Sequence, residues 1–245
     1  MTILPDEVLL LERELRGVFA ARLHALVAYG LGAPGPATAR PAPSRDAAAP
    51  QTQTLAIVES LEQHDLAACA ERIDTWHAAG LATPLLLTSA EFRRSLDAFP
   101  LEFGAIIADH TLVAGRDPFE GAAVDSADIR RACEVQARSH LLHLREGYLE
   151  TEGKADRLAT LIVRSAAPFA ALLASIARLQ GLPAADQAVA RIAQDELHLP
   201  QGVVTDLVAL ARVTDISPEE AARMFPAYLD ATERLVHYVD GWSSQ

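Results

Sequence analysis

Histidines and carboxylates stand three residues apart at two places in the second half of the chain. His140, His143 and Glu146 form one set, and Asp195 with His198 forms the other. Three-residue spacing puts side chains on one face of a helix, where imidazole and carboxylate groups can bind a metal ion. Such a site needs a third or fourth ligand at a known place, and the sequence supplies none. We therefore expect exposed polar pairs on helices at both places, and no metal.

A second set of candidates lies where two apolar runs meet a long intervening segment. The runs LHALVAY (23–29) and TLAIVES (54–60) are typical of buried strands, and Gly30 ends the first. Thr52 and Thr54 stand at the start of the second. Between the runs, residues 31–51 are mostly Ala, Pro and Gly without apolar periodicity. This composition predicts a mobile loop, which is either functional or vestigial.

Composition excludes several classes of protein. Half of the 245 residues are hydrophobic and 22% are charged, so the chain can bury a sizeable core. A net charge of -12 repels phosphates and anionic lipids, so broad nucleic-acid binding is not expected. Cys69 and Cys133 are expected to be reduced core cysteines of a cytoplasmic protein. Neither a signal peptide nor a membrane span is expected.

The first half of the chain alternates helical and strand patterns. Apolar residues recur every three or four positions in the helices expected over 6–22, 66–80 and 89–99. The strands are expected over 23–29, 54–60, 84–88 and 100–108, the last of them being the apolar run PLEFGAIIA. The order α-β-β-α-β-α-β predicts an α/β sheet with helices packed on it.

The second half reads as helices only. They are expected over 126–150, 155–180, 184–197 and 201–212, followed by a last helix that begins at Ser217. The last start is well marked, because Ser217 can cap the helix, Pro218 suits its first turn and Glu220 completes a capping box. The composition changes near 121–126. We therefore expect two domains, an α/β domain over 1–122 and an all-α domain over 125–245.

In its order of elements and in three short stretches, the chain resembles nucleotidyltransferase-fold proteins of the small bacterial type. The stretches are AYG ending at Gly30, TQTLAIVE from Thr52, and LVAGRDPF over 112–119. The second half resembles the substrate-binding or HEPN-type helical domains that accompany them. The resemblance implies the fold class α+β, with an α/β-type sheet domain followed by an all-α helical bundle. It also implies carboxylates that hold two magnesium ions and align a nucleoside triphosphate.

Matched residue by residue, this chain has lost most of the chemistry that the resemblance implies. Gly30 fits the glycine of the motif, but Leu31 stands where a serine or second glycine would bind phosphate. Thr52 and Thr54 stand where the family has two aspartates, and Glu102 matches the third carboxylate. A threonine hydroxyl is neutral and a poor ligand for magnesium, which prefers carboxylate and phosphate oxygens. Only Arg40 and Arg45 remain on the loop to meet a triphosphate.

The site positions are therefore interpreted as vestigial, with no catalytic residue, no metal and no cofactor. The expected function is a catalytically inactive nucleotidyltransferase-like protein with a binding or regulatory role, which meets a protein partner or a second copy at its helical domain. The alternative is an active nucleotidyltransferase that uses magnesium and a nucleoside triphosphate in a rearranged site. Glu102 with Asp46 or Asp109 would then be the ligands.

The helical domain offers one more candidate pair. Arg138 and His143 have the loose spacing of a HEPN ribonuclease motif, in which the two residues would serve the scissile phosphate and the proton transfer. The same pattern recurs at Arg191 and His198, which shows how easily it arises by chance. We therefore expect Arg138 and His143 to lie on a solvated helix face.

Overall fold

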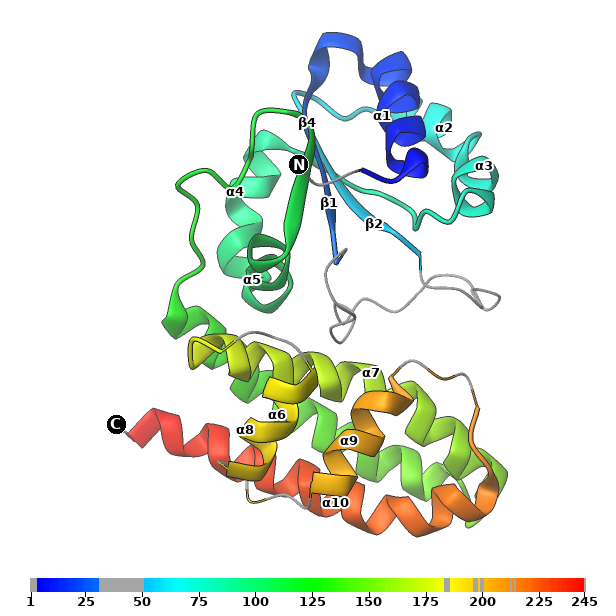
Figure 1. Ribbon diagram of the computed structural model, residues 1–245, viewed down its shortest axis with the longest axis vertical. Helices are drawn as coiled ribbons and strands as arrows, with labels where there is room; N and C mark the ends of the chain where they lie inside the picture. Colours follow the sequence, from blue (N-terminus) through cyan, green and yellow to red (C-terminus); the bar gives the residue numbers. More distant parts are fainter. Residues whose placement is uncertain are drawn as a thin grey trace. The chain divides into compact units, whose positions relative to one another are not determined.

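A computed structural model of the chain describes residues 4–30, 51–182, 186–195, 198, 201–211, 213 and 215–244. The described residues form two compact units. The sheet unit ends at Val124 and the helical unit begins at Asp125. Figure 1 shows strands and helices in the first and helices alone in the second. The fold class expected from the sequence, α+β followed by a helical bundle, is confirmed.

The sheet unit is built on one mixed sheet of four strands in the order β3-β2-β1-β4. The strands are β1 (Leu23–Tyr29), β2 (Gln53–Val58), β3 (Leu85–Thr88) and β4 (His110–Gly115). β1 pairs antiparallel with both β2 and β4, while β2 and β3 run parallel. β1 and β2 were expected from their apolar runs, and their side chains are buried on both faces. They form the centre of the sheet.

Helices cover the two faces of this sheet (Figure 1). One face is covered by α1 (Asp6–Phe19), α2 (Gln63–Ala70) and α3 (Ile73–Ala78), and the other by α4 (Ser89–Ala98) and α5 (Pro100–Ala108). The first face buries Leu26, Ala28 and Ala56 against α1, and the second buries Val27 and Leu55 against α4 and α5. Alternate residues of each central strand therefore belong to different cores.

The expected strand over 100–108 is wrong, because these residues form the helix α5. Pro100 stands in its first turn, where a missing N–H does no harm, and Glu102 lies near the positive end of the helix dipole. Its buried residues Pro100, Phe103 and Ile106 recur at three-residue spacing. The strand that completes the sheet is β4 (His110–Gly115), which begins two residues after the end of the expected strand. The single helix expected over 66–80 is likewise two helices, α2 and α3.

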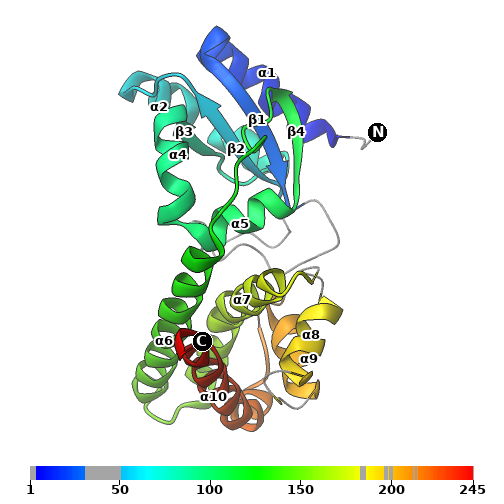
Figure 2. The same cartoon turned by 90° about the vertical axis from the view of Figure 1, so that its left-hand side faces the viewer.

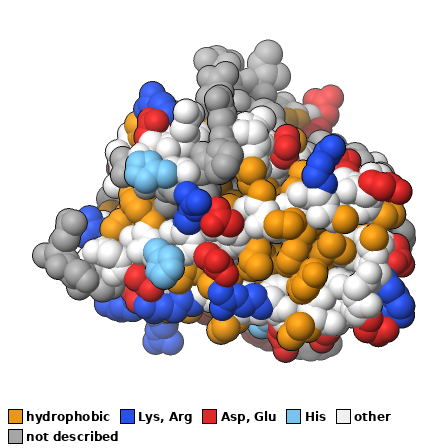
Figure 3. All heavy atoms as spheres, turned by 90° about the horizontal axis from the view of Figure 1, so that it is seen from below, with side chains coloured by type: hydrophobic (Ala, Val, Ile, Leu, Met, Phe, Trp, Pro, Cys, Tyr) orange, Lys and Arg blue, Asp and Glu red, His pale blue; other side chains and the backbone are white. Residues whose placement is uncertain are grey.

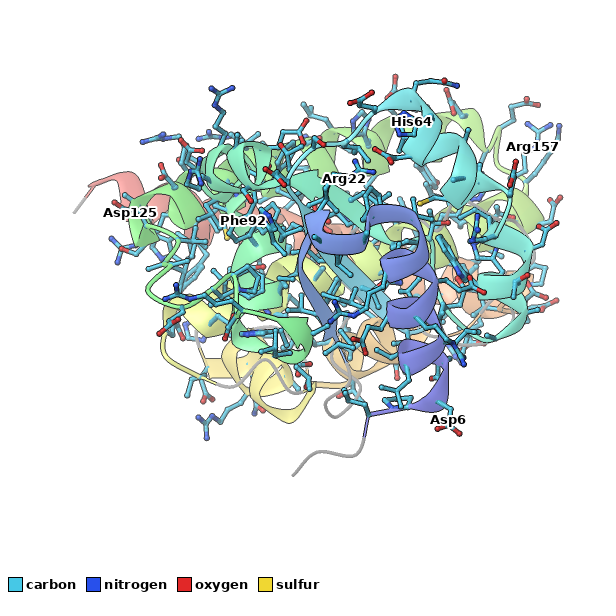
Figure 4. The ribbon with its side chains drawn as sticks, turned by 90° about the horizontal axis from the view of Figure 1, so that it is seen from above. Asp6, Arg22, His64, Phe92, Asp125 and Arg157 are labelled. Atoms are coloured by element: carbon cyan, nitrogen blue, oxygen red, sulfur yellow. The ribbon has the colours of Figure 1, made fainter. Side chains whose placement is uncertain are left out.

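An ion pair ties the start of β1 to α2 (Figure 4). Arg22, in the short 3-10 turn Ala20–Arg22, donates from both terminal nitrogens to the Asp65 carboxylate, at 2.7 and 2.9 Å. Asp65 also accepts from the backbone N–H of Glu62. The Arg22 hydrogen bonds hold the pKa of Asp65 well below its usual range. The ion pair holds α2 against the start of β1, and its role is therefore structural.

The helical unit contains five long helices and a short 3-10 turn among its described residues. They are α6 (Ser126–Glu150), α7 (Ala155–Leu179), α8 (Asp186–Asp195), α9 (Gln201–Leu210), α10 (Pro218–Asp240) and the turn Gly241–Ser244. The expected cap is confirmed, since the Ser217 hydroxyl accepts from the Glu220 N–H at 3.1 Å. Figure 2 shows α6, α7 and α10 lying along one another.

The interior of the helical unit centres on α7. This helix is long and apolar enough to cross a membrane, the one such helix in the described chain, but most of its apolar stretch is buried among the other helices. Burial of that kind is what a core helix requires. Cys133 of α6 lies in this interior, and Cys69 of α2 lies in the sheet unit. Both are buried free thiols, as expected.

Candidate functional site

The candidate site lies at the edge of the sheet that the strand ends form, at the point where the central strand β1 ends and its neighbour β2 begins. Tyr29 is paired with Gln53 of β2 on one side and with His110 of β4 on the other. Gly30 follows with φ +69°, a left-handed backbone that glycine adopts without strain. Its N–H donates to the Asp109 carbonyl at 3.2 Å. The glycine expected at the end of the first strand therefore closes the strand by turning its backbone away.

Thr52 lies beside this edge and contacts α1. Its backbone joins Leu81 in an isolated parallel bridge, and its hydroxyl donates to the Glu7 carboxylate at 3.3 Å. Glu7 is a residue that the sequence did not bring to attention. It stands in the first turn of α1, where the helix dipole favours an acidic side chain. The threonine at this position is therefore half-buried and bonded to a carboxylate of the neighbouring helix.

Thr54 points to the same face of the sheet and is enclosed. It is paired with Ala28, so it shares the face that α1 covers, and only 1% of its surface is exposed. Its hydroxyl oxygen is buried and has no hydrogen-bond partner among the residues that the structure describes. A hydroxyl left without a partner in the core costs about 1–3 kcal/mol. The second motif position thus lies inside the core.

Glu102 is separated from the two threonines by the sheet. It stands in the first turn of α5, which packs on the face opposite to α1. The match of Glu102 to a carboxylate on a later strand is wrong in this respect, because its segment is helical. The structure therefore brings Thr52 and Thr54 together on one face and leaves Glu102 on the other.

Asp109 is the other described carboxylate that was weighed as a metal ligand. It follows the last residue of α5, seven residues after Glu102, so the two backbones are about 10 Å apart along the helix axis. Carboxylates that share a magnesium ion place their oxygens about 2.1 Å from it. Glu102 and Asp109 thus lie at opposite ends of α5, and no group of three or more potential metal ligands forms around them among the described residues. Leu31, Arg40, Arg45 and Asp46 lie outside the described residues.

The donor set at this edge does not fit two magnesium ions. Among the described residues, no group of three or more His, Cys, Asp or Glu side chains converges as metal ligands. The two motif positions offer hydroxyls, one of them buried without a partner, where magnesium requires charged oxygens open to water and phosphate. We derive no chemical step through a metal from this arrangement.

The turn after β4 follows Gly115, the last residue of the strand. Gly115 has φ +80°, and a Cβ placed there would lie 1.9 Å from the His24 carbonyl oxygen. The Asp117 carboxylate then accepts from the Phe119 N–H at 2.8 Å and lies 3.4 Å from His110 Nε2. This turn covers the apolar core beside α5. The residues RDPF therefore close the sheet unit through backbone geometry.

The candidates in the helical unit separate in the structure. His140 is buried and its Nε2 lies 2.9 Å from the Tyr228 hydroxyl, whereas His143 and Glu146 are exposed and 3.3 Å apart. Burial lowers the pKa of His140 to about 4. Arg138 and His143 are five residues apart, which puts them about 140° apart around the helix. The solvated face expected for Arg138 and His143 is confirmed, since both are exposed. The expected exposure is wrong for His140, which is a core residue.

Comparison with solved structures gives a match over nearly the whole chain. The chain is similar to spectinomycin adenyltransferase AAD(9) from Enterococcus faecialis, solved with ATP and spectinomycin. The two share 13% sequence identity with a TM-score of 0.50, and the match covers 94% of this chain and 98% of that one. No family model and no curated protein matches the sequence. The likeness shows the fold, a nucleotidyltransferase-like α+β unit followed by a helical unit.

Proposed function

We propose that this chain is a catalytically inactive nucleotidyltransferase-like protein with a binding or regulatory role. The observation that carries the proposal is the state of Thr54, an uncharged residue at a motif position and enclosed in the core. A catalytic metal site needs charged ligands that remain open to the triphosphate. The frame of the fold is kept, while the group that would do the chemistry is replaced and covered.

Charge supports the same proposal. Two magnesium ions bring four positive charges, and a site holds them only if carboxylates and phosphate oxygens neutralise them. Thr52 and Thr54 contribute none of that charge. Glu7 is the nearest described carboxylate to Thr52, and its oxygen accepts the Thr52 hydroxyl. A single carboxylate bonded in this way does not replace two aspartates at the start of a strand.

The proposal is tested by incubating the full chain with magnesium and each labelled nucleoside triphosphate. Acceptors would include spectinomycin, the compound bound in the structural neighbour. We expect no pyrophosphate release and no labelled product above a no-protein control. Glu102→Gln would be assayed beside Glu71→Gln, an exposed carboxylate directly after α2, and we expect both to behave as wild type.

Transfer of labelled nucleotide by the wild type would overturn the proposal. If Glu102→Gln abolished that transfer and Glu71→Gln did not, the chain would be an active nucleotidyltransferase whose site includes Glu102. Among the described residues, no group of three or more potential metal ligands includes Glu102, which argues against that outcome.

A further inference from the structure

Helix α6 carries an apolar stripe on its exposed side. Val135, Leu142 and Leu149 are 62, 63 and 77% exposed and recur every seven residues. Of the large hydrophobic side chains that the described part of the helical unit exposes, all but Val213 lie on this helix. Seen from below, the unit shows hydrophobic side chains gathered between charged ones (Figure 3). We call these three residues the α6 stripe.

The α6 stripe lies opposite to the face that α6 buries in its own unit. The residues buried in the unit are Cys133, Ala137, His140, Leu141 and Leu144. At 100° per residue, most of these side chains lie about 140–180° around the helix from Leu142. The outer face of a surface helix is ordinarily polar. A helix that is apolar on its outer face as well has an unused packing surface, and such surfaces mark interaction sites.

The spacing of the stripe suits packing against another helix. A repeat of seven residues keeps the stripe on one side of the helix, and it supplies one of the two apolar positions per heptad that a coiled-coil seam uses. From Val135 to Leu149 the stripe is about 21 Å long, at 1.5 Å per residue. That length gives four turns of contact, enough for a small interface.

The charges on the two sides of the stripe have opposite signs. Arg138 and Arg145 lie about 40–60° to one side of Leu142, and Glu146 and Glu150 lie about 40–80° to the other. All four side chains are exposed. Both arginines already have partners in their own unit: Arg138 pairs with Glu134 and Asp240, and Arg145 reaches Glu233 of α10 at 2.7 Å, while the arginine side chains stay half-exposed. The stripe is thus bordered by a basic flank (Arg138, Arg145) and an acidic flank (Glu146, Glu150).

We infer that the α6 stripe binds the same stripe of a second copy of this chain, with the two α6 helices parallel and in register. A twofold axis along the stripe places the basic flank of one copy against the acidic flank of the other, so Arg145 faces Glu146 of the partner helix. An antiparallel pairing would set basic flank against basic flank, which is unfavourable. The two charged flanks of the stripe are therefore complementary to those of a second copy only in the parallel orientation.

The size of the stripe sets the strength of this association. Stable interfaces bury about 800 Å² on each partner, and three exposed side chains supply less than that. We therefore expect a reversible dimer that forms at tens to hundreds of micromolar. An anionic membrane is disfavoured as the occupant, because the chain carries a net charge of -12. The inference does not depend on whether the sheet unit is catalytic.

Sedimentation of the full chain over a wide concentration range tests the dimer. We expect the average mass of the wild type to rise toward that of a dimer, and Leu142→Glu to remain monomeric throughout. Leu9→Glu is the matched control, since Leu9 is 44% exposed on α1 of the other unit, and it should behave as wild type. A wild type that stays monomeric at millimolar concentration, or a Leu142→Glu that dimerises equally, would overturn the inference.

Charge reversal tests the pairing of the flanks. Arg145→Glu and Glu146→Arg should each weaken dimerisation by about tenfold, and the double variant should recover most of the loss. The recovery separates an intermolecular pair from the contact of Arg145 with Glu233, which the double variant does not restore. Additive weakening in the double variant would rule out the proposed contact.

Cysteine cross-linking tests the orientation. Both native thiols are buried, so single cysteines placed at 135, 142 or 149 would be the reactive ones. In the parallel arrangement each faces its own copy, and Val135→Cys, Leu142→Cys and Leu149→Cys should all give disulfide dimers on mild oxidation. Leu9→Cys should not. Cross-linking of Leu142→Cys alone would show an antiparallel pair and overturn the proposed arrangement.

Discussion

Two regions of this molecule differ in whether their buried polar side chains have hydrogen-bond partners. At the sheet edge beside Gly30, the motif positions carry Thr52 and Thr54, and the enclosed one has a hydroxyl without a described partner. In the helical unit, buried His140 is bonded to Tyr228 at 2.9 Å, and buried Thr232 donates to the Tyr228 carbonyl at 2.9 Å. The sheet unit thus encloses an uncharged motif position, and the helical unit encloses titratable groups that serve packing.

The difference teaches that a residue's type indicates chemistry only together with its surroundings. A histidine beside a tyrosine is a familiar catalytic pair, yet burial lowers the pKa of His140 to about 4 and raises that of Tyr228. Both groups are therefore neutral at pH 7 and enclosed by Phe169. Under the proposed function, the two threonines occupy the motif positions and lack the charge that nucleotidyl transfer needs.

The largest effect is expected from restoring a carboxylate to the enclosed motif position. Thr54→Asp would bury an unpaired charge, and we expect it to lower the free energy of unfolding by about 3–5 kcal/mol at pH 7. The penalty should shrink as the pH falls, because burial raises the pKa of such a carboxyl and protonation removes its charge. Urea unfolding at pH 7 and pH 5 measures both. An unchanged stability would mean that position 54 is open to solvent.

The second effect concerns a glycine that the frame of the sheet unit requires. Gly115→Ala would place a Cβ against the His24 carbonyl at a positive φ, and we expect a loss of about 3 kcal/mol or more. Gly121→Ala is the matched control, because Gly121 also has a positive φ but open space around it. It should cost about 1–2 kcal/mol. Equal losses in urea unfolding would remove the steric argument.

The buried histidine of the helical unit should make stability depend on pH. The pKa of His140 is about 4 in the folded chain and near 6.5 unfolded, so the unfolded state takes up the proton first as pH falls. The free energy of unfolding should fall by roughly 3 kcal/mol between pH 6.5 and 4, at 1.36 kcal/mol per pKa unit. His140→Gln should flatten this dependence, and His143→Gln, at an exposed site, should keep it. A dependence that survives in His140→Gln would assign it elsewhere.

The smallest expected effect is a change in the free energy of unfolding that has opposite signs in the sheet unit and in the helical unit. Thr54→Val replaces a hydroxyl without a partner by a methyl group of similar shape, and we expect a gain of about 1 kcal/mol. Thr232→Val, equally buried, loses its bond to the Tyr228 carbonyl and should cost about 1 kcal/mol. The two variants would be compared by thermal unfolding under one set of conditions. Changes of the same sign would contradict the contrast between the regions.

Much of this fold could be predicted from apolar patterns. β1 was expected at 23–29 because a seven-residue apolar run ends at a glycine, and the cap at Ser217 followed from Pro218 and Glu220. The segment 100–108 was assigned wrongly because a short apolar run fits a strand and a buried helix alike. Its Pro100 and Glu102 were the signals of a helix start that would have corrected it.

The candidate site was predictable only in part, for a reason of topology. Thr54 belongs to β2 and Thr52 directly precedes this strand, so their place near Gly30 followed from the pairing of two neighbouring runs. The separation of Glu102 from them depends on which face of the sheet α5 covers, and a single sequence does not show that. The burial of His140 depends in the same way on the packing of α10 against α6.

The most direct test of the central claim is the thermal unfolding midpoint of the wild type with millimolar magnesium and each of ATP, GTP, CTP and UTP. A ligand that binds the folded state raises this midpoint in proportion to its occupancy. Since the motif positions carry no charge to hold the metal, we predict no change beyond that seen with magnesium or nucleotide alone. A rise of several degrees that requires both magnesium and a triphosphate, and that Glu102→Gln abolishes, would contradict the account.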